Sequence, residues 1–181
     1  MDPSHPHLTD PSPWVKRFAV LVPRGGGVLD VACGGGRHAR HFAARGHPVE
    51  AVDRDAEALA GLAGAPHIVT RCADLEGGPW PYAGRRFAGI VVANYLHRPL
   101  LPLLAAALEP GGVLIYETFM LGNEKFGRPA NPDFLLKPGE LLEFCRGRLH
   151  VVAFEQGEVS SPKPALVQRL CAVNGPGSLL P

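Results

Sequence analysis

The sequence has little excess charge and no long apolar run, and each shortage excludes a class of protein. The 18 Lys and Arg residues nearly balance the 17 Asp and Glu residues, which leaves a formal net charge of +1. Proteins that bind nucleic acid usually carry a basic stripe or patch, so no nucleic-acid partner is expected. No apolar run approaches the roughly 20 residues needed to cross a bilayer, and the first 13 residues lack the pattern of a signal peptide. We therefore expect a cytoplasmic protein that makes no contact with membranes.

Cysteine is also scarce, with four residues in the chain. Cys33, Cys72, Cys145 and Cys171 are widely spaced and form no CxxC pair. A zinc site or a redox dithiol therefore has little support, and free buried cysteines are the expectation. No other cluster of ligand side chains indicates a metal, so none is expected.

The composition indicates one globular domain. The chain has 181 residues, of which 46% are hydrophobic and 19% are charged, as is usual for a folded domain that buries a core. We expect a flexible N-terminal segment over residues 1–12, a folded domain over 13–175 and a C-terminal tail over 176–181.

Short apolar runs alternate with helical segments through the first two thirds of the chain. The expected strands are residues 27–32, 48–53, 67–70, 87–93 and 112–118, and the expected helices are residues 13–22, 37–45, 55–62 and 99–108. Residues 73–86 contain three glycines and two prolines, so this segment is expected to be a loop. An alternation of this kind predicts βαβ units, which connect right-handedly into a parallel sheet covered on both faces.

The last third of the sequence changes pattern. A helix is expected over residues 138–145, followed by two strands, 149–154 and 166–173, with no helix between them. Two consecutive strands form an antiparallel hairpin. The predicted fold class is therefore α/β, with a Rossmann-like, doubly wound, mostly parallel sheet of seven strands that ends in an antiparallel hairpin.

The first turn from strand to helix carries three consecutive glycines, Gly34 to Gly36. Glycine lets the backbone turn sharply and lets a ligand approach it closely, and ligands of open α/β sheets bind beyond the carboxyl ends of the strands. Asp53 follows about 20 residues later, where an acid can accept hydrogen bonds from ribose hydroxyls. Both features suit NAD and S-adenosylmethionine (SAM) alike. Asp30, just before the glycines, favours SAM, because an acid would repel a pyrophosphate but attract an ammonium and a sulfonium.

Residues 28–36, Val-Leu-Asp-Val-Ala-Cys-Gly-Gly-Gly, resemble motif I of the class I SAM-dependent methyltransferases. Asp53 matches the ribose-binding acid of that family, and the pair at 73–74 matches its adenine-contacting position. The chain departs from the family where Ala32 replaces the usual glycine and where the loop at 73–86 replaces a helix. The segments 94–99, 116–119 and 122–136 are most similar to small bacterial enzymes of the tellurite-resistance type.

The resemblance implies SAM as the cofactor and a set of residues that would bind it. These are Asp30, Ala32, Cys33, Gly34, Gly36, Arg37, Asp53, Arg54, Ala73, Asp74, Leu75 and Asn94.

Residues after the fourth and fifth strands face the acceptor in this architecture. Tyr95, His97 and Arg98 are therefore the catalytic candidates. A histidine can act as a general base near neutral pH, although His97 and Arg98 can equally pack against or cap the following helix.

The expected substrate pocket takes residues from the end of the fifth strand and from the long loop at 121–137. Its candidates are Tyr116, Glu117, Phe119, Phe126, Arg128 and Asn131. Glu117 can equally point to solvent, and the loop can be a substrate lid or a plain surface loop. Lys163, in the turn of the final hairpin, can reach the acceptor site, but a surface position away from the acceptor is favoured.

The sequence thus predicts transfer of a methyl group from SAM to a small-molecule acceptor, such as a thiol, a chalcogen oxyanion or a small metabolite, by in-line displacement. A non-catalytic module that binds SAM or S-adenosylhomocysteine is the alternative. An RNA or protein methyltransferase and an NAD-dependent enzyme are less favoured. Both a monomer and a homodimer agree with the sequence.

Overall fold

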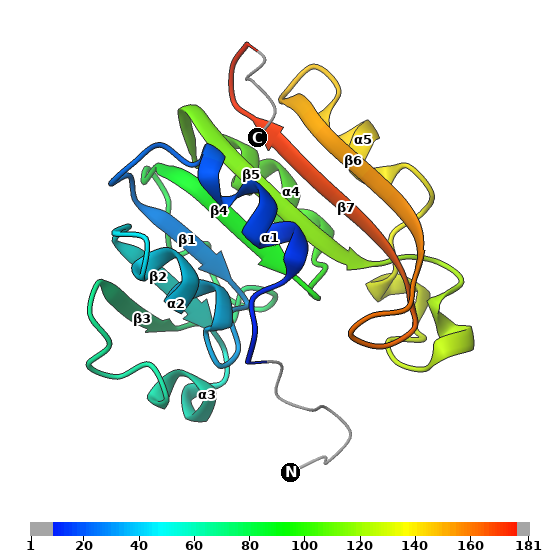
Figure 1. Ribbon diagram of the computed structural model, residues 1–181, viewed down its shortest axis with the longest axis horizontal. Coiled ribbons are helices and arrows are strands. Elements are labelled where there is room, and N and C mark those ends of the chain that lie inside the picture. The colour runs from blue at the N-terminus through cyan, green and yellow to red at the C-terminus, as the bar shows by residue number, and fades with distance from the viewer. Residues whose placement is uncertain (1–8, 177–181) are drawn as a thin grey trace.

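The computed structural model describes residues 9–176, in which a seven-stranded sheet forms the centre of the molecule (Figure 1). The strand order is β3-β2-β1-β4-β5-β7-β6. The strands are β1 (Val28–Val31), β2 (Val49–Asp53), β3 (Ile68–Cys72), β4 (Phe87–Ala93), β5 (Leu108–Phe119), β6 (His150–Val159) and β7 (Ala165–Val173). The first five pair in parallel, and β7 lies antiparallel to both β5 and β6. The predicted doubly wound sheet with a closing hairpin is confirmed.

Helices cover both faces of this sheet. The helices are α1 (Pro13–Phe18), α2 (Arg37–Ala43), α3 (Ala56–Ala60), α4 (Leu101–Ala106) and α5 (Glu140–Cys145). Figure 1 shows α1 and α2 on one face and α4 and α5 on the other. Each face has its own apolar cluster: Trp14, Phe18 and Phe42 belong to the first, whereas Leu104 and Leu141 belong to the second. A sheet buried on both sides explains the near-continuous apolar character of β1 and β4.

The start of α1 shows how local sequence and distant packing combine. The Ser12 hydroxyl accepts a hydrogen bond from the Trp14 backbone N–H at 3.1 Å, and Pro13 occupies the first helical position, where its missing N–H costs nothing. The Trp14 indole N–H then donates to the Leu170 carbonyl of β7 at 3.1 Å. The expected helix at 13–22 ends earlier than predicted, because residues Ala19–Leu21 form a 3₁₀ turn.

Two segments after β4 also differ from the sequence-based expectation. The helix expected at 99–108 begins as a 3₁₀ turn, η2 (Arg98–Leu100), and α4 ends at Ala106. The loop expected at 121–137 contains two 3₁₀ turns, η3 (Asn123–Phe126) and η4 (Pro132–Phe134), and is joined to the end of β5 by a bridge between Met120 and Leu136. Both differences reflect tertiary pairing, which periodicity does not report.

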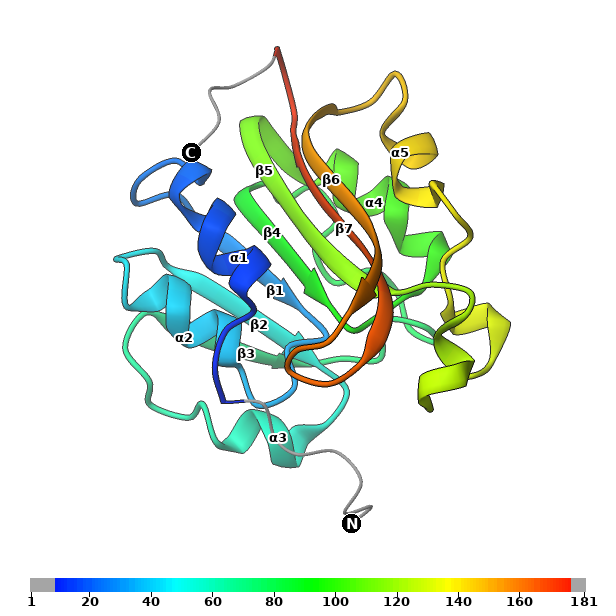
Figure 2. The same cartoon turned by 45° about the vertical axis from the view of Figure 1, so that its right-hand side comes forward.

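All seven strands bring functional segments to one edge of the sheet. The parallel strands β1 to β5 end there, and the turn between β6 and β7 lies at the same edge because β7 runs antiparallel to β5, so that β7 begins beside the end of β5 (Figure 2). This arrangement places the glycine loop, the segment after β4, the loop at 121–137 and the hairpin turn in one region.

Parts of the expected domain limits fall outside the described residues. The structure gives no account of residues 1–8 and 177–181, which make up most of the two expected terminal segments. Within residues 9–176, no helix combines the length and the apolar character that a membrane span requires.

Gly36, at the start of α2, is a position where only glycine fits. Its φ is +74°, and an added Cβ would collide with the Leu62 side chain. We expect Gly36→Ala to lower the free energy of unfolding by about 1–3 kcal/mol, through left-handed strain and overpacking. Urea unfolding followed by circular dichroism measures the effect.

Gly35→Ala is the matched control, since nothing lies within 4 Å of a Cβ added at Gly35. Equal stabilities of the two variants would contradict this account of the turn.

Candidate functional site

A cavity of about 940 Å³ opens at the edge where the parallel strands end. Its strand-end half is formed by residues that follow β1 to β4: Ala32, Asp53, Arg54, Ala73, Asp74, Leu75, Glu76, Asn94, Tyr95 and Leu96. Its loop half is formed by the end of β5, the loop after it and the hairpin turn: Thr118, Phe119, Arg128, Pro129, Ala130, Asn131, Phe134, Pro162 and Lys163. Ligand pockets usually measure about 300–1,000 Å³, so this cavity has room for two small molecules.

The glycine loop after β1 is hydrogen-bonded to the Asp53 carboxylate. Asp53 accepts a hydrogen bond from the Gly34 N–H at 2.7 Å through one oxygen and from the Asp55 N–H at 2.9 Å through the other. Gly34 is left-handed, with φ +52°. Asp53 thus fixes the loop after β1 to the end of β2 while its carboxylate lines the cavity.

Ala32 adopts the left-handed conformation that glycine normally supplies. Its φ is +52°, and it lines the cavity. A residue with a Cβ costs roughly 1–2 kcal/mol in this region, so the backbone around Ala32 is held against local preference. Alanine at position 32, where the family usually has glycine, therefore keeps the left-handed backbone of the loop and adds a methyl group beside the cavity.

Asp30 lies behind the loop and does not line the cavity. Its side chain is 1% exposed and accepts a hydrogen bond from the Ala39 N–H of α2 at 2.8 Å. Burial raises the pKa of the Asp30 carboxyl to about 7, which the Ala39 hydrogen bond and the charge of Arg37 only partly oppose. Asp30 therefore joins β1 to α2, and this contact, rather than one with a ligand, is what the structure shows for it.

The expected cofactor residues fall into two groups, those that line the cavity and those that do not. Of the twelve, the cavity is lined by Ala32, Asp53, Arg54, Ala73, Asp74, Leu75 and Asn94. The remaining five lie in β1, in the loop after it or at the start of α2: Asp30, Cys33, Gly34, Gly36 and Arg37. Burial raises the pKa of the Cys33 thiol, which keeps it neutral.

The segment after β3 supplies an ionised acid and an apolar wall. The Asp74 carboxylate accepts a hydrogen bond from the Glu76 N–H at 3.0 Å. The backbone N–H groups of Glu76 and Gly77 lower the pKa of Asp74. Leu75 is buried next to this acid, so the segment presents a charge and an apolar side chain to the cavity together.

Of the three catalytic candidates after β4, only Tyr95 lines the cavity. Burial and the neighbouring Glu76 carboxylate raise the pKa of the Tyr95 hydroxyl, so Tyr95 is a hydrogen-bond donor at neutral pH and not a base. His97 is half-buried outside the cavity wall, and its carbonyl accepts the Leu100 N–H at 3.0 Å in the first turn of η2.

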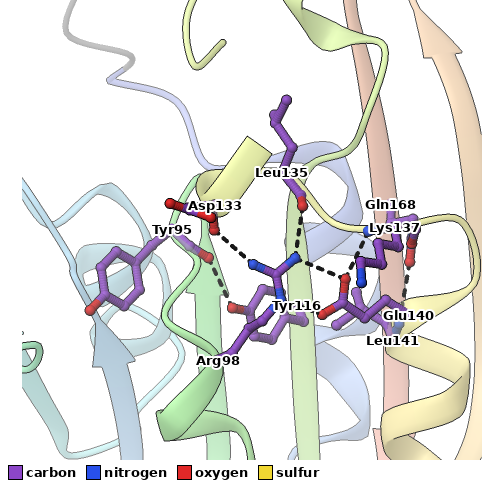
Figure 3. A network of polar contacts seen from close by, with 9 residues as sticks. All are labelled: Tyr95, Arg98, Tyr116, Asp133, Leu135, Lys137, Glu140, Leu141 and Gln168. Atoms are coloured by element: carbon purple, nitrogen blue, oxygen red, sulfur yellow. Dashed lines mark hydrogen bonds and ion pairs between the residues drawn. The ribbon is translucent and has the colours of Figure 1, made fainter. Parts of the chain in front are cut away.

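Arg98 is the centre of a polar network that holds the loop half in place (Figure 3). Its guanidinium donates to both oxygens of Glu140, at 2.7 and 3.0 Å. It also donates to the carbonyls of Asp133 and Leu135, both at 2.8 Å. The Glu140 carboxylate accepts the Lys137 N–H at 2.7 Å as well. Arg98 therefore binds two ends of the 131–140 segment to the segment after β4, and it contacts no part of the cavity wall directly.

Tyr116 and Glu117 also serve the structure and not the cavity wall. The Tyr116 hydroxyl donates a hydrogen bond to the Tyr95 carbonyl (Figure 3). The distance is 2.9 Å, and the Tyr116 side chain is buried. Glu117 lies in an ion pair with Arg169 at 3.1 Å. Successive side chains of a strand point to opposite faces of the sheet, so Tyr116 and Glu117 of β5 lie on different faces.

The loop half contains three of the six expected substrate residues. Phe119, Arg128 and Asn131 line the cavity, whereas Phe126 does not. Lys163 does line it, which corrects the expectation that this lysine lies away from the acceptor region. The hairpin is longer than predicted, because β6 extends to Val159 and β7 begins at Ala165, and this length carries the turn to the edge of the sheet where the cavity opens.

The predicted site residues leave out several residues that line the cavity, namely Glu76, Leu96, Thr118, Pro129, Ala130, Phe134 and Pro162, although Leu96 and Phe134 lie in segments expected near the acceptor. Phe134 carried a signal, since it is an aromatic residue in a polar loop. The others carried none that a single sequence reveals. Among the described residues, no group of three or more His, Cys, Asp or Glu side chains is placed to hold a metal ion.

The buried Asp30 predicts an unusual dependence of stability on pH. The pKa of its carboxyl is about 7 in the folded state, above the value of about 3.9 for an unfolded aspartate, so folding favours the protonated form. The contribution of Asp30 to stability is therefore complete below pH 4 and is lost as the pH rises to 7. We expect Asp30→Asn to gain stability relative to the wild type by about 1–4 kcal/mol between pH 4.5 and pH 7.5, measured by urea unfolding.

Asp55→Asn is the control for this experiment, because Asp55 is exposed and asparagine preserves its cap on α3. If both variants changed equally with pH, or neither did, the burial of the Asp30 charge would not govern this dependence.

Arg98→Met is expected to loosen the loop half without unfolding the sheet. The variant loses the ion pair with Glu140 and two hydrogen bonds to loop carbonyls, which should lower the free energy of unfolding by about 1–3 kcal/mol. The amides of Phe134 and Leu135, which are hydrogen-bonded within the loop, should exchange at least tenfold faster with solvent.

Hydrogen exchange resolved by residue measures this change. Arg148→Met, which removes one exposed hydrogen bond to the Phe144 carbonyl, is the control and should leave the loop amides protected. Unchanged exchange in Arg98→Met would show that the loop holds its shape without the guanidinium.

Comparison with known proteins agrees with this geometry. Residues 28–112, from β1 into β5, match the family model of the methyltransferase domain. No curated protein matches the chain.

Solved structures share the fold at low sequence identity. The chain is similar to TehB from Haemophilus influenzae (TM-score 0.72, 18% identity), with 89% of this chain and 61% of that chain covered. A TehB-like SAM-dependent methyltransferase from Corynebacterium glutamicum is similar as well (TM-score 0.63, 20% identity, 89% and 86% covered).

A third similar structure is 1,6-didemethyltoxoflavin-N1-methyltransferase from Burkholderia thailandensis (TM-score 0.64, 22% identity, 90% and 76% covered), which was solved with 1,6-didemethyltoxoflavin and S-adenosylhomocysteine bound. The family match over residues 28–112, the doubly wound sheet with its antiparallel hairpin, and the cavity at the end of β1 agree: the chain has the fold of the class I SAM-dependent methyltransferases and resembles the TehB type.

Proposed function

We propose that this methyltransferase transfers the methyl group of SAM to a small-molecule acceptor bound in the loop half of the cavity. The observation that carries the proposal is the division of one cavity into two walls of different origin. The strand-end wall follows β1 to β4, and the loop wall covers the space next to it. The proposal includes a cytoplasmic enzyme that acts as a monomer or a homodimer.

The residues of the strand-end half fit the cofactor. Asp53 presents a carboxylate that can accept hydrogen bonds from two ribose hydroxyls. Ala73, Asp74 and Leu75 offer an apolar wall with one acid, which suits an adenine ring and its amino group. The loop at Ala32 and the side chain of Asn94 border the remaining space. When bound, SAM supplies a methyl group on a sulfonium, which is a good leaving group.

The protein itself needs to align two ligands and exclude water. Tyr95 stays protonated and can donate a hydrogen bond into the cavity. The Asp74 carboxyl is ionised at neutral pH and too weakly basic to remove a proton from a hydroxyl. An acceptor that already carries a nucleophilic anion or lone pair therefore suits this site best, as a thiolate or a chalcogen oxyanion does.

The three catalytic candidates take different parts in this proposal. Tyr95 is the one that can touch an acceptor, because it lines the cavity. Arg98 is a positioning residue that acts through the 131–140 segment. For His97 the position outside the cavity wall favours a role in the turn that begins η2 over a role as a base.

The similar structures support a small acceptor without identifying it. The 1,6-didemethyltoxoflavin bound in one of them is a small molecule, and TehB is the relative with the highest TM-score among the three described. The chain spans 61% of the TehB chain, so the acceptor of that enzyme is not carried over.

Calorimetric titration with S-adenosylhomocysteine tests the cofactor site. We expect the wild type to bind it, and Asp53→Ala to bind it at least tenfold more weakly, since the substitution removes the hydrogen bonds of a charged acceptor that contribute about 1.5–3 kcal/mol each. Asp55→Asn is the matched control, because Asp55 neighbours Asp53 but does not line the cavity. Absence of binding to the wild type, or equal binding to Asp53→Ala, would overturn the assignment of the strand-end half.

A further inference from the structure

The loop half of the cavity has a distinct chemistry, in which two cations stand beside two phenyl rings. Arg128 and Lys163 line it together with Phe119 and Phe134. None of the described residues that line this half carries a carboxylate. The strand-end half has the opposite balance, since three carboxylates, Asp53, Asp74 and Glu76, face one guanidinium, Arg54.

Lys125 and Arg169, which lie near the loop half, are each paired with a carboxylate, whereas Lys163 is not. Lys125 pairs with Glu158 at 3.0 Å, and Arg169 pairs with Glu117 at 3.1 Å. The described residues give Lys163 no hydrogen-bond or ion-pair partner, although Glu158 lies in the same hairpin. A charged group that lines a cavity without a protein partner is available to a ligand of opposite charge.

The charges of SAM also limit the charge of the acceptor. SAM carries a sulfonium and an ammonium, which suit the acidic strand-end half. A cationic or neutral acceptor would leave the ammonium of Lys163 and the sulfonium of SAM as two uncompensated positive charges inside one cavity. An anionic acceptor offsets all of these charges, and it also approaches the sulfonium with a favourable Coulomb interaction.

The phenyl rings indicate the body of that acceptor. Phe134 is 47% exposed although it lines the cavity, and Phe119 ends β5 in a half-buried position. The turn η4, which carries Phe134, is held by the Arg98 hydrogen bonds to the Asp133 and Leu135 carbonyls on either side of it. An exposed aromatic ring that the protein holds in place offers a flat apolar surface, which a bare and strongly hydrated oxyanion does not use.

We propose that the methyl acceptor is an organic anion with a flat, apolar body, whose charged group binds Lys163 and Arg128 and whose ring lies against Phe119 and Phe134. This inference rests on the proposed function and specifies its substrate class. A nucleophilic atom on the acceptor forms the new bond to the methyl carbon. The bond between that carbon and the sulfonium sulfur breaks, and its electron pair stays on the sulfur of S-adenosylhomocysteine.

Binding to the protein saturated with S-adenosylhomocysteine tests the proposal directly. The probes are benzoate and benzamide, which match in shape and differ in charge, together with selenite as a bare oxyanion. We expect benzoate to bind at least tenfold more tightly than benzamide. Lys163→Met should reduce this preference at least threefold, and the Lys163→Met, Arg128→Met double variant should abolish it. Lys125→Met is the control. Lys125 lies on the same loop as Arg128 but is paired with Glu158 and does not line the cavity, so this variant should retain the preference for benzoate.

A second variant separates the apolar body from the charge. Phe134→Ala should weaken benzoate at least threefold and leave selenite unchanged. Equal binding of benzoate and benzamide to the wild type would overturn the proposal, as would selenite binding as tightly as benzoate. Both results leave the proposed function intact as long as S-adenosylhomocysteine still binds, whereas loss of that binding in the wild type overturns the proposed function itself.

Discussion

The parallel register of β1 with its two neighbours determines where the functional side chains lie. Val31 is paired with Val52 on one side and with Val92 on the other, so the chain leaves all three strands at the same level. Ala32, Asp53 and Asn94 follow within two residues of these pairs and line one cavity. A shift of one residue in the β1–β2 ladder would turn the Asp53 carboxylate to the opposite face of the sheet and out of reach of the Gly34 N–H.

The strand-end half of the site is thus built by short connections close to the sheet. Asp53 is held by two backbone N–H groups, and Asp74 by the turn that follows it. In each of these hydrogen bonds a backbone N–H donates to the carboxylate, so the contacts depend on the local path of the chain and on no side chain from a distant segment. Ala32 shows the strength of this framework, since the backbone keeps a left-handed path there although a methyl group opposes it.

The loop half depends on contacts between segments far apart in the chain. Arg98 reaches 42 residues ahead to Glu140, and Gln168 of β7 accepts the Leu141 N–H at 3.3 Å and donates to the Lys137 carbonyl at 2.5 Å. These bonds are close in space but remote in sequence, so the loop half takes its shape only where the antiparallel hairpin lies beside the sheet.

The sequence alone determined the order of strands and helices, the parallel sheet with its closing hairpin, the loop without a helix at 73–86, and eight of the residues that line the strand-end half. The elements follow from periodicity and from the placement of glycine and proline, which are local signals, and most of the lining residues follow from the resemblance to a methyltransferase motif. The tertiary structure alone decided that Asp30 binds α2 behind the loop, that Arg98 holds the acceptor wall, that Glu117 pairs with Arg169 and that Lys163 reaches the cavity. The physical reason is that burial, ion pairing and the partner of a buried polar group depend on which distant segments meet, and a residue's type and neighbours in the chain do not record that meeting.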